Sequence, residues 1–294
     1  GHNIAYDMSV FAKHDTSLLR PIFQAYSEGR IRDTQLRESL IRIEAGTFKD
    51  HRTGQRRPLS LDSIAQERLE MTLDKGDDGW RTRYGELYDV PLDQWPERAR
   101  AYALNDPLAT MRVYQSQGES KPDEVLQTRA AFALRLMSAH GVVTDESACD
   151  AFEIAIREAM LDKQAVLLEA GVVRSNGTRD TKLIRALVET ALPKAPRTDP
   201  SDRFPDGQIK MDEETLKMSG DSVLIALADY SYQSKLLDTF LPIVRAGVDH
   251  PIHGSFETLV ESGRTSAYKP NWQNLPREKG ARECVRARPS KVLL

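Results

Sequence analysis

The organisation of this chain is decided by one stretch, Ser262-Gly263-Arg264-Thr265-Ser266-Ala267-Tyr268-Lys269-Pro270-Asn271-Trp272-Gln273-Asn274-Leu275-Pro276. Gly263, Pro270 and Pro276 interrupt regular helix, so the stretch is predicted to be extended and rich in turns. Between these residues stand side chains that donate and accept hydrogen bonds, namely Arg264, Ser266, Asn271, Gln273 and Asn274. On composition alone, a polar surface loop would explain the stretch.

Basic residues gather in and after this stretch. Positions 264–291 hold eight Lys or Arg residues, at 264, 269, 277, 279, 282, 286, 288 and 291, against two acids at 278 and 283. Because the 294 residues together carry a net charge of −3, the remainder of the chain is acidic. Binding to nucleic acid, if it occurs, is therefore expected in one local basic groove and not over the whole surface.

Length and composition set the broad class. A chain of 294 residues is long enough for two or three domains with cores of their own. No window approaches 18 uncharged apolar residues, which excludes a predicted membrane span. The two cysteines, Cys149 and Cys284, are isolated in sequence, as in a reduced cytoplasmic protein without a cysteine metal site. The first residues have neither an initiator Met nor a signal peptide, so we expect a fragment of a longer protein from the cytoplasm.

Two pairs of polar residues are spaced four positions apart. Asn3 and Asp7 form one pair, and Tyr102 and Asp106 form the other. Residues with this spacing share one face of a helix. Each pair by itself is most simply explained by a helix cap or by surface polarity.

The order of these residues resembles the family A DNA polymerases, the DNA polymerase I type of bacteria and phages. Gly-Arg-x-Ser, followed after three residues by Pro-Asn-x-Gln-Asn-x-Pro, matches eight fixed positions in fourteen of the signature that opens the palm of that family. Gly-His-Asn-x-x-x-Asp at the start of the chain, and Tyr-x-x-x-Asp about a hundred residues later, resemble the second and third motifs of the DEDD-type 3′–5′ proofreading exonucleases. In family A enzymes that exonuclease is the N-terminal neighbour of the polymerase. The pattern at 280–284 is most similar to the phage branch.

The resemblance implies roles for the exonuclease residues. Asp7 and Asp106 would bind metal, Tyr102 would orient the attacking water, and Asn3 would support substrate or ligand geometry. The cofactor would be Mg²⁺ in a two-metal site, where several carboxylates converge on the ions. The first exonuclease motif, Asp-x-Glu, and the palm aspartates have no counterpart in the chain, so we expect the isolated chain to be catalytically incomplete.

The resemblance also implies partners, primer–template DNA and, in the parent enzyme, nucleoside triphosphates. Arg264 would enter the minor groove at the primer terminus. The base edges present hydrogen-bond acceptors there that are common to all base pairs. The other predicted DNA-binding residues are Ser266, Asn271, Gln273, Asn274, Lys235 and Lys182.

The predicted fold class is α/β plus mostly α. Residues 1–118 would form a truncated ribonuclease H-like 3′–5′ exonuclease domain, 119–250 a helical palm base and thumb, and 251–294 the first strands of a polymerase palm. Short strands are expected at 30–33, 253–256 and 292–294. Long helices are expected to end at Gly141 and Gly171. The proline-rich residues 193–207 are expected to form a loop at the tip of the thumb.

Two other functions remain open at this point. One is a stand-alone DEDD-type exonuclease, which would have no use for the Gly-Arg-x-Ser segment. The other is a non-catalytic DNA-binding subunit of a split polymerase, completed by a second chain. The coding sequence on either side would separate a fragment of a longer polymerase from the product of a split gene.

Overall fold

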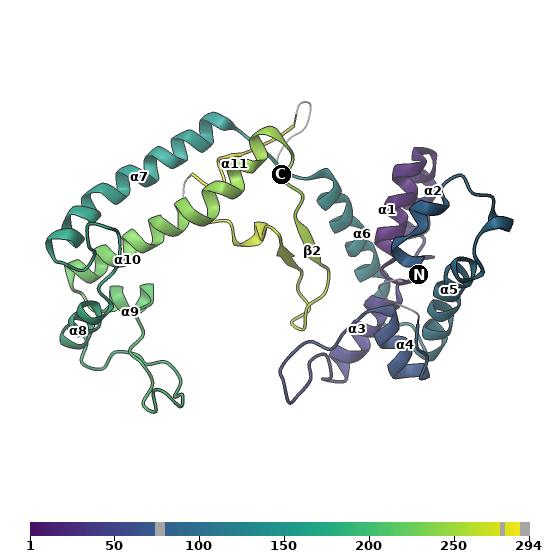
Figure 1. The fold of residues 1–294 in the computed structure, drawn as a ribbon, viewed down its shortest axis with the longest axis horizontal. Coiled ribbons are helices and arrows are strands. Elements are labelled where there is room, and N and C mark those ends of the chain that lie inside the picture. The colour runs from purple at the N-terminus through teal and green to yellow at the C-terminus, as the bar shows by residue number, and fades with distance from the viewer. Residues whose placement is uncertain (74–79, 277–279, 289–294) are drawn as a thin grey trace. The chain divides into compact units, whose positions relative to one another are not determined.

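The computed structural model describes residues 1–73, 80–276 and 280–288. The chain divides into two compact units, each built from two segments of sequence (Figure 1). The first unit contains Gly1–His140 and Gly254–Gln273, and the second contains Gly141–His253 and Asn274–Leu294. These units follow contacts within the chain, so the functional domain boundaries at 118 and 250 stay predictions. The strand predicted at 292–294 lies outside the described residues.

The first unit is a set of helices with one small hairpin. Its helices are α1 (Ile4–His14), α2 (Leu19–Ser27), α3 (Thr34–Glu44), α4 (Leu61–Leu69), α5 (Glu97–Ser116) and α6 (Glu124–His140). Short 3₁₀ turns lie at Thr16–Leu18, Trp80–Thr82, Tyr84–Leu87, Leu92–Gln94 and Trp272–Asn274. Strands β2 (Ser255–Glu257) and β3 (Ser266–Tyr268) pair antiparallel, with Phe256 opposite Ala267. The strand predicted at 253–256 is therefore present, but it begins two residues later and ends one residue later.

Two apolar clusters hold these helices together. Tyr26 of α2 stacks on Phe132 of α6 with ring centroids 4.3 Å apart, beside the buried Ala5 and Ala12 of α1. A second cluster packs α4 against α5 and includes the fully buried side chain of Ile64. Together the clusters fix α1 and α5, the helices that carry both polar pairs.

The strand predicted at 30–33 is not formed. Residues 30–33 lie outside any helix or strand, and α3 begins directly after them. A strand needs a neighbour to take up its backbone hydrogen bonds, and no strand pairs with this segment within the described residues. Asp33 instead ends the segment as the N-cap of α3.

The second unit contains the longest helices. They are α7 (Glu146–Glu169), α8 (Thr181–Ala191), α9 (Glu213–Met218), α10 (Ser222–Lys235) and α11 (Leu241–Asp249), with a π-helical turn at Leu236–Phe240 between the last two. Strand β1 (Val143–Thr144) pairs antiparallel with β4 (Val285–Arg286). Gly141 and Gly171 follow α6 and α7 with φ of 69° and 71°, which confirms the predicted helix ends.

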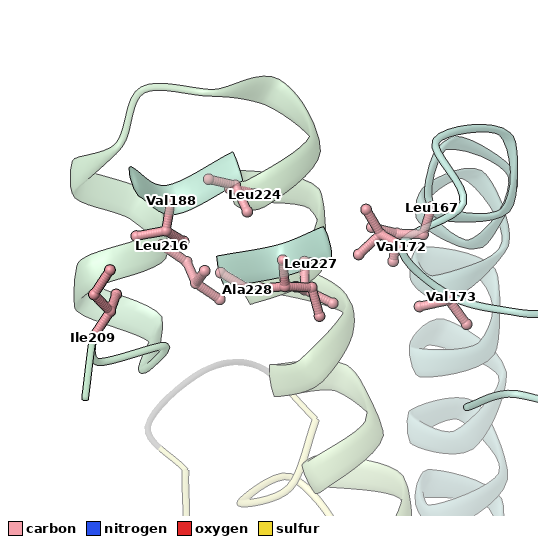
Figure 2. Close-up of a cluster of buried hydrophobic side chains, with 10 residues drawn as sticks. Leu167, Val172, Val173, Val188, Ile209, Leu216, Leu224, Leu227 and Ala228 are labelled. Carbon is pink, nitrogen blue, oxygen red and sulfur yellow. The ribbon is translucent and has the colours of Figure 1, made fainter. Parts of the chain in front are cut away.

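Helices α7 and α10 run side by side in opposite directions (Figure 1). The C-terminal end of α7 and the N-terminal end of α10 pack with α8 and α9 around a core of buried aliphatic side chains (Figure 2). Within it, Leu167, Val188 and Leu224 are completely buried.

The proline-rich loop at 193–207 has internal structure of its own. Arg197 bridges to Ile209 in the antiparallel sense, and Thr198 donates its backbone N–H to Gln208 at 2.7 Å. Gly207 stands against Thr198 where a side chain has no room, because a Cβ there would lie 2.1 Å from the Thr198 carbonyl oxygen. The loop is thus folded back on itself as an irregular hairpin.

The two cysteines, distant in sequence, are neighbours in the second unit. Both are completely buried and neither forms a disulfide. Burial raises the pKa of the Cys284 thiol to about 12, and the adjacent Cys149 adds to the shift. The Cys284 thiol is therefore protonated and unreactive near neutral pH.

Taken as a whole, the chain is mostly helical with two small two-stranded sheets among its described residues. The α/β part of the predicted fold class, a ribonuclease H-like domain at 1–118, is not confirmed, since the described part of that range is helical without a named strand. A search of the described residues finds no helix long and apolar enough to cross a membrane.

Candidate functional site

All four predicted exonuclease residues line one cavity of about 880 Å³ in the first unit. Asn3 and Asp7 reach it from α1, and Tyr102 and Asp106 reach it from α5. The two pairs are nearly a hundred residues apart in sequence. Convergence on one cavity is the arrangement that two i, i+4 pairs need if they are to act together.

Asp7 lies in the first turn of α1 and is partly buried. Burial raises the pKa of this carboxyl above its ordinary value. The ammonium group of Gly1 opposes the shift, and the carboxylate of Asp33 adds to it. Desolvation penalises the charged form, so Asp7 holds its proton to higher pH than a solvated aspartate does.

Tyr102 and Asp106 lie one turn apart on α5, which continues through Pro107. The Tyr84 ring stands beside Tyr102 with centroids 6.0 Å apart, and its hydroxyl donates to the Ala99 carbonyl at 2.9 Å. Burial, followed by the charge of Asp106, raises the pKa of Tyr84. Tyr84 therefore stays a neutral donor that braces this face of α5.

One residue that sequence reasoning missed positions α1 relative to α3. The Asp33 carboxylate accepts the backbone N–H groups of Asn3 at 3.1 Å and Ile4 at 3.0 Å, and it also accepts those of Gln35 and Leu36. It is 2% exposed. A single buried charge thus satisfies the N-termini of two helices. The sequence shows that Asp33 can cap the helix that follows it, α3. It does not show that Asp33 also caps α1.

A buried ion pair performs a similar task for α3, α5 and α6. Arg37 donates to both carboxylate oxygens of Glu124, at 2.8 and 2.9 Å, and its guanidinium lies 4.2 Å from the centre of the Tyr114 ring. Ser120 donates a further hydrogen bond to Glu124 at 2.8 Å. Tyr114 itself lines the cavity. The pair therefore connects the wall of the cavity to the helices behind it.

The donors around this cavity do not amount to a two-metal site. Two divalent ions need several carboxylates converging on them. Within residues 1–73, 80–276 and 280–288, no group of three or more His, Cys, Asp or Glu side chains could hold a metal ion. Asp7 and Asp106 alone do not fit a pair of Mg²⁺ ions, and no reaction step through Mg²⁺ is derived from these residues.

The Gly263–Pro276 stretch begins with an exposed turn after β2. Arg264 is exposed, and its carbonyl accepts the Val260 N–H at 2.9 Å. Ser266 opens β3 opposite Glu257 and is half-buried. The predicted extended, turn-rich character of the stretch is confirmed, and Arg264 is accessible to a ligand.

Gln273 has a structural part in this stretch. Its side-chain carbonyl accepts the Ala267 N–H at 3.0 Å, and its amide nitrogen donates to the Thr265 hydroxyl at 3.1 Å. Asn271 accepts the backbone N–H of Gln273 at 3.1 Å. The Gln273 side chain therefore holds the turn after β3 against the strand, and its contact with DNA stays a prediction.

Trp272 packs within the first unit. A Cβ at Gly254 would lie 2.7 Å from its Cδ1 atom, so only glycine allows the indole this close to the backbone. The indole nitrogen is buried and has no hydrogen-bond partner among the described residues. The indole is therefore packed against the backbone at Gly254.

The remaining predicted DNA-binding residues belong to the second unit. Lys182 lies in the first turn of α8, Lys235 ends α10 before the π-helical turn, and Asn274 follows the hairpin region. All three are exposed. Of the basic tail, positions 277, 279 and 291 lie outside the described residues.

No protein-family model and no curated protein sequence matches the chain. Among solved structures, it is similar to the POL domain of Pol1 from M. smegmatis in complex with DNA primer-template and dNTP, with a TM-score of 0.55 and 19% sequence identity. The match covers 86% of this chain. The chain has the fold of part of a DNA polymerase domain. It spans 40% of the matched chain.

Proposed function

We propose that the chain is part of a family A DNA polymerase of the DNA polymerase I type, closest to the phage branch, and that it binds primer–template DNA. The observation that carries this proposal is the coincidence of two independent features in one chain. The Gly263–Pro276 segment matches the palm signature of that family, and the fold is similar to a polymerase domain bound to primer-template and dNTP.

The DNA contacts would come from the side chains that the sequence predicted, most of which are exposed. Arg264 and Ser266 stand on the β2–β3 hairpin, where Arg264 would read the minor groove at the primer terminus. Asn271 and Gln273 would contact sugars and minor-groove edges, and Asn274 would be a further DNA-binding residue. Lys182 and Lys235 would neutralise phosphates without reading sequence.

The 880 Å³ cavity would be the remaining part of a proofreading exonuclease site. In this proposal Asp7 and Asp106 are metal ligands, Tyr102 orients water and Asn3 supports the substrate. What supports the assignment is the shared lining of one cavity by residues from two distant motifs. A localisation in the cytoplasm of a bacterial or phage-infected cell accompanies the proposal.

A second candidate function is a non-catalytic DNA-binding subunit, completed by another polymerase chain. The described residues hold no three-ligand group for a metal ion, and this fits a chain that needs carboxylates from elsewhere. Both candidates predict DNA binding, and they differ in whether a parent protein or a separate chain supplies the missing carboxylates.

The isolated chain is expected to bind primer–template DNA weakly and with steep salt dependence. Raising salt from 50 to 200 mM should reduce affinity by roughly a hundredfold if about four phosphates are neutralised. Arg264→Ala should reduce affinity by about tenfold, as expected for loss of a base-edge contact. Titration of fluorescein-labelled duplex, followed by anisotropy, measures both effects.

Arg52→Ala is the matched control, because Arg52 is an exposed arginine in another loop of the same unit. It should bind like the unmodified chain. Equal losses in the Arg264 and Arg52 variants would indicate nonspecific charge attraction, and absence of binding even at low salt would refute the proposed DNA-binding function.

The isolated chain is expected to show neither nucleotide incorporation nor 3′ trimming with Mg²⁺. Two carboxylates cannot hold two divalent ions in place. Alignment of nucleophile and phosphate, which is worth up to ~7–11 kcal/mol, is then lost together with electrostatic stabilisation of the transition state. Extension and degradation of a labelled primer on a sequencing gel test this expectation.

Asp106→Asn is the control for that experiment. Any trace of 3′ trimming that persists in this variant comes from a contaminating enzyme. Activity of the unmodified chain that disappears in the variant would show that the chain completes a catalytic site by itself, and the assignment of its ligands would be wrong.

A further inference from the structure

A second cavity, of about 610 Å³, lies in the same unit among α1, α3, α6 and the β2–β3 hairpin. Residues 56–60 close one side of it. Asn3, Gln35 and Ser60 line this cavity and the first one. The two spaces therefore adjoin, but no sequence motif described above points to the second.

The lining of this cavity is positively charged. Arg56, Arg57 and Arg135 contribute guanidinium groups, whereas Glu257 is the one carboxylate among its lining residues. Arg56 pairs with Glu257, and Arg57 pairs with Glu67 outside the cavity at 2.9 Å. Arg135 forms no ion pair within the described residues. One cation is thus left without a carboxylate partner in the space.

Arg135 is held in place without its charge being neutralised. Its Nε donates to the Ser9 hydroxyl at 3.3 Å, and its guanidinium carbon lies 5.1 Å from the centre of the Tyr6 ring. Stacking on an aromatic face fixes a guanidinium while leaving its charge in place. Among the described residues, its two terminal amino groups, Nη1 and Nη2, have no protein acceptor. A fork of this kind binds phosphate oxygens in bidentate fashion.

The rest of the lining suits a small phosphate ester. Ser138 and Ser255 contribute hydroxyl groups, and Phe256 and Tyr268 contribute rings, with Tyr268 47% exposed. A volume of about 610 Å³ falls in the range of small-molecule sites. Carboxylate ligands would be recognised less specifically than phosphate, which can engage several guanidinium and hydroxyl donors at once.

We infer that this cavity binds the phosphate group of a small phosphate monoester, such as a nucleoside monophosphate, with Arg135 as the main phosphate ligand. The ring surfaces of Phe256 and Tyr268 would contact the organic part. This inference does not depend on the proposed polymerase function, because it rests on the cavity and its charges alone.

The test is calorimetric titration of the full chain at low salt with three probes: inorganic phosphate, deoxyadenosine monophosphate and deoxyadenosine. Both phosphates should bind with a Kd of about 1 mM or tighter, and deoxyadenosine, which has no phosphate, should not. Arg135→Gln should weaken the binding of both phosphates at least tenfold. Arg135→Lys, which keeps the charge but loses the fork, should give an intermediate value.

Arg112→Gln is the matched control, since Arg112 is an exposed arginine of α5 that lines neither cavity. It should bind as the unmodified chain does. Should Arg135→Gln fail to fold, Ser255→Glu tests the same site by placing a negative charge in it, and it should abolish binding.

Three results would overturn the inference. They are absence of phosphate binding, equal binding in the Arg135 and Arg112 variants, and binding of a tetrathymidylate oligonucleotide without binding of the monophosphate. The last result would assign the cavity to a nucleic-acid strand. Failure here leaves the proposed function intact, because primer–template binding is measured with the Arg264 variant and a different probe.

Discussion

Replacing Glu124 with alanine is expected to lower the free energy of unfolding of the first unit by about 3–5 kcal/mol. Arg37 and Glu124 are 1% and 0% exposed, so the substitution leaves a guanidinium buried without its carboxylate. Desolvation of an unpaired charge, not the loss of attraction alone, makes this change costly. The same loss removes the contact that ties α3 to α6.

Urea denaturation followed by tryptophan fluorescence measures the unfolding of the first unit. All three tryptophans of the chain, at positions 80, 95 and 272, belong to the first unit. The double variant Arg37→Met with Glu124→Leu should recover most of the stability, because it removes both charges and fills the space. A Glu124→Ala variant that unfolds at the same urea concentration as the unmodified chain would show that the pair is solvated.

Replacing Asp33 with alanine is expected to cost about 1–4 kcal/mol, since one side chain caps two helices and each cap is worth 0.5–2 kcal/mol. Backbone N–H groups of Asn3, Ile4, Gln35 and Leu36 would lose their acceptor at once. The N-terminus of α1 should then fray, which displaces Asn3 and Asp7 from the cavity. Asp33→Asn, which keeps one acceptor oxygen, should lose about half as much.

Asp50→Ala provides the comparison. Asp50 also accepts backbone N–H groups, from Arg52 and Thr53, but it does so in an exposed loop. Its removal should change stability little, because water replaces the lost acceptor. Equal effects of the Asp33 and Asp50 variants on the urea midpoint would mean that the double cap of Asp33 contributes nothing beyond an ordinary turn.

The local elements of this chain were largely predictable. Glycines at 141 and 171 stop helices because they adopt positive φ without strain, and Asp180 and Asp212 cap helices through their own side chains. Such effects act over three or four residues, so they are visible in the sequence. The two i, i+4 pairs were identified on the same basis, and their meeting at one cavity agrees with the geometry expected from the motifs.

Pairings between distant residues were decided by the tertiary structure alone. Arg37 and Glu124 are 87 positions apart, Cys149 meets Cys284, and Asp33 caps a helix that precedes it by 29 positions. Residues 30–33, predicted as a strand, are not one, because strand formation depends on a neighbour that local sequence does not specify.

What the sequence by itself determined is the helices, their ends and the Gly263–Pro276 signature, since each depends on short-range backbone preferences and residue order. Only the tertiary structure decided which polar side chains form hydrogen bonds within the fold and which remain available to bind a ligand. The Gln273 side chain forms hydrogen bonds within its own turn, whereas the Arg135 guanidinium has no ion-pair partner among the described residues. The physical reason is that hydrogen-bond partners and burial depend on contacts between segments far apart in the chain, and neither is encoded in the spacing of residues.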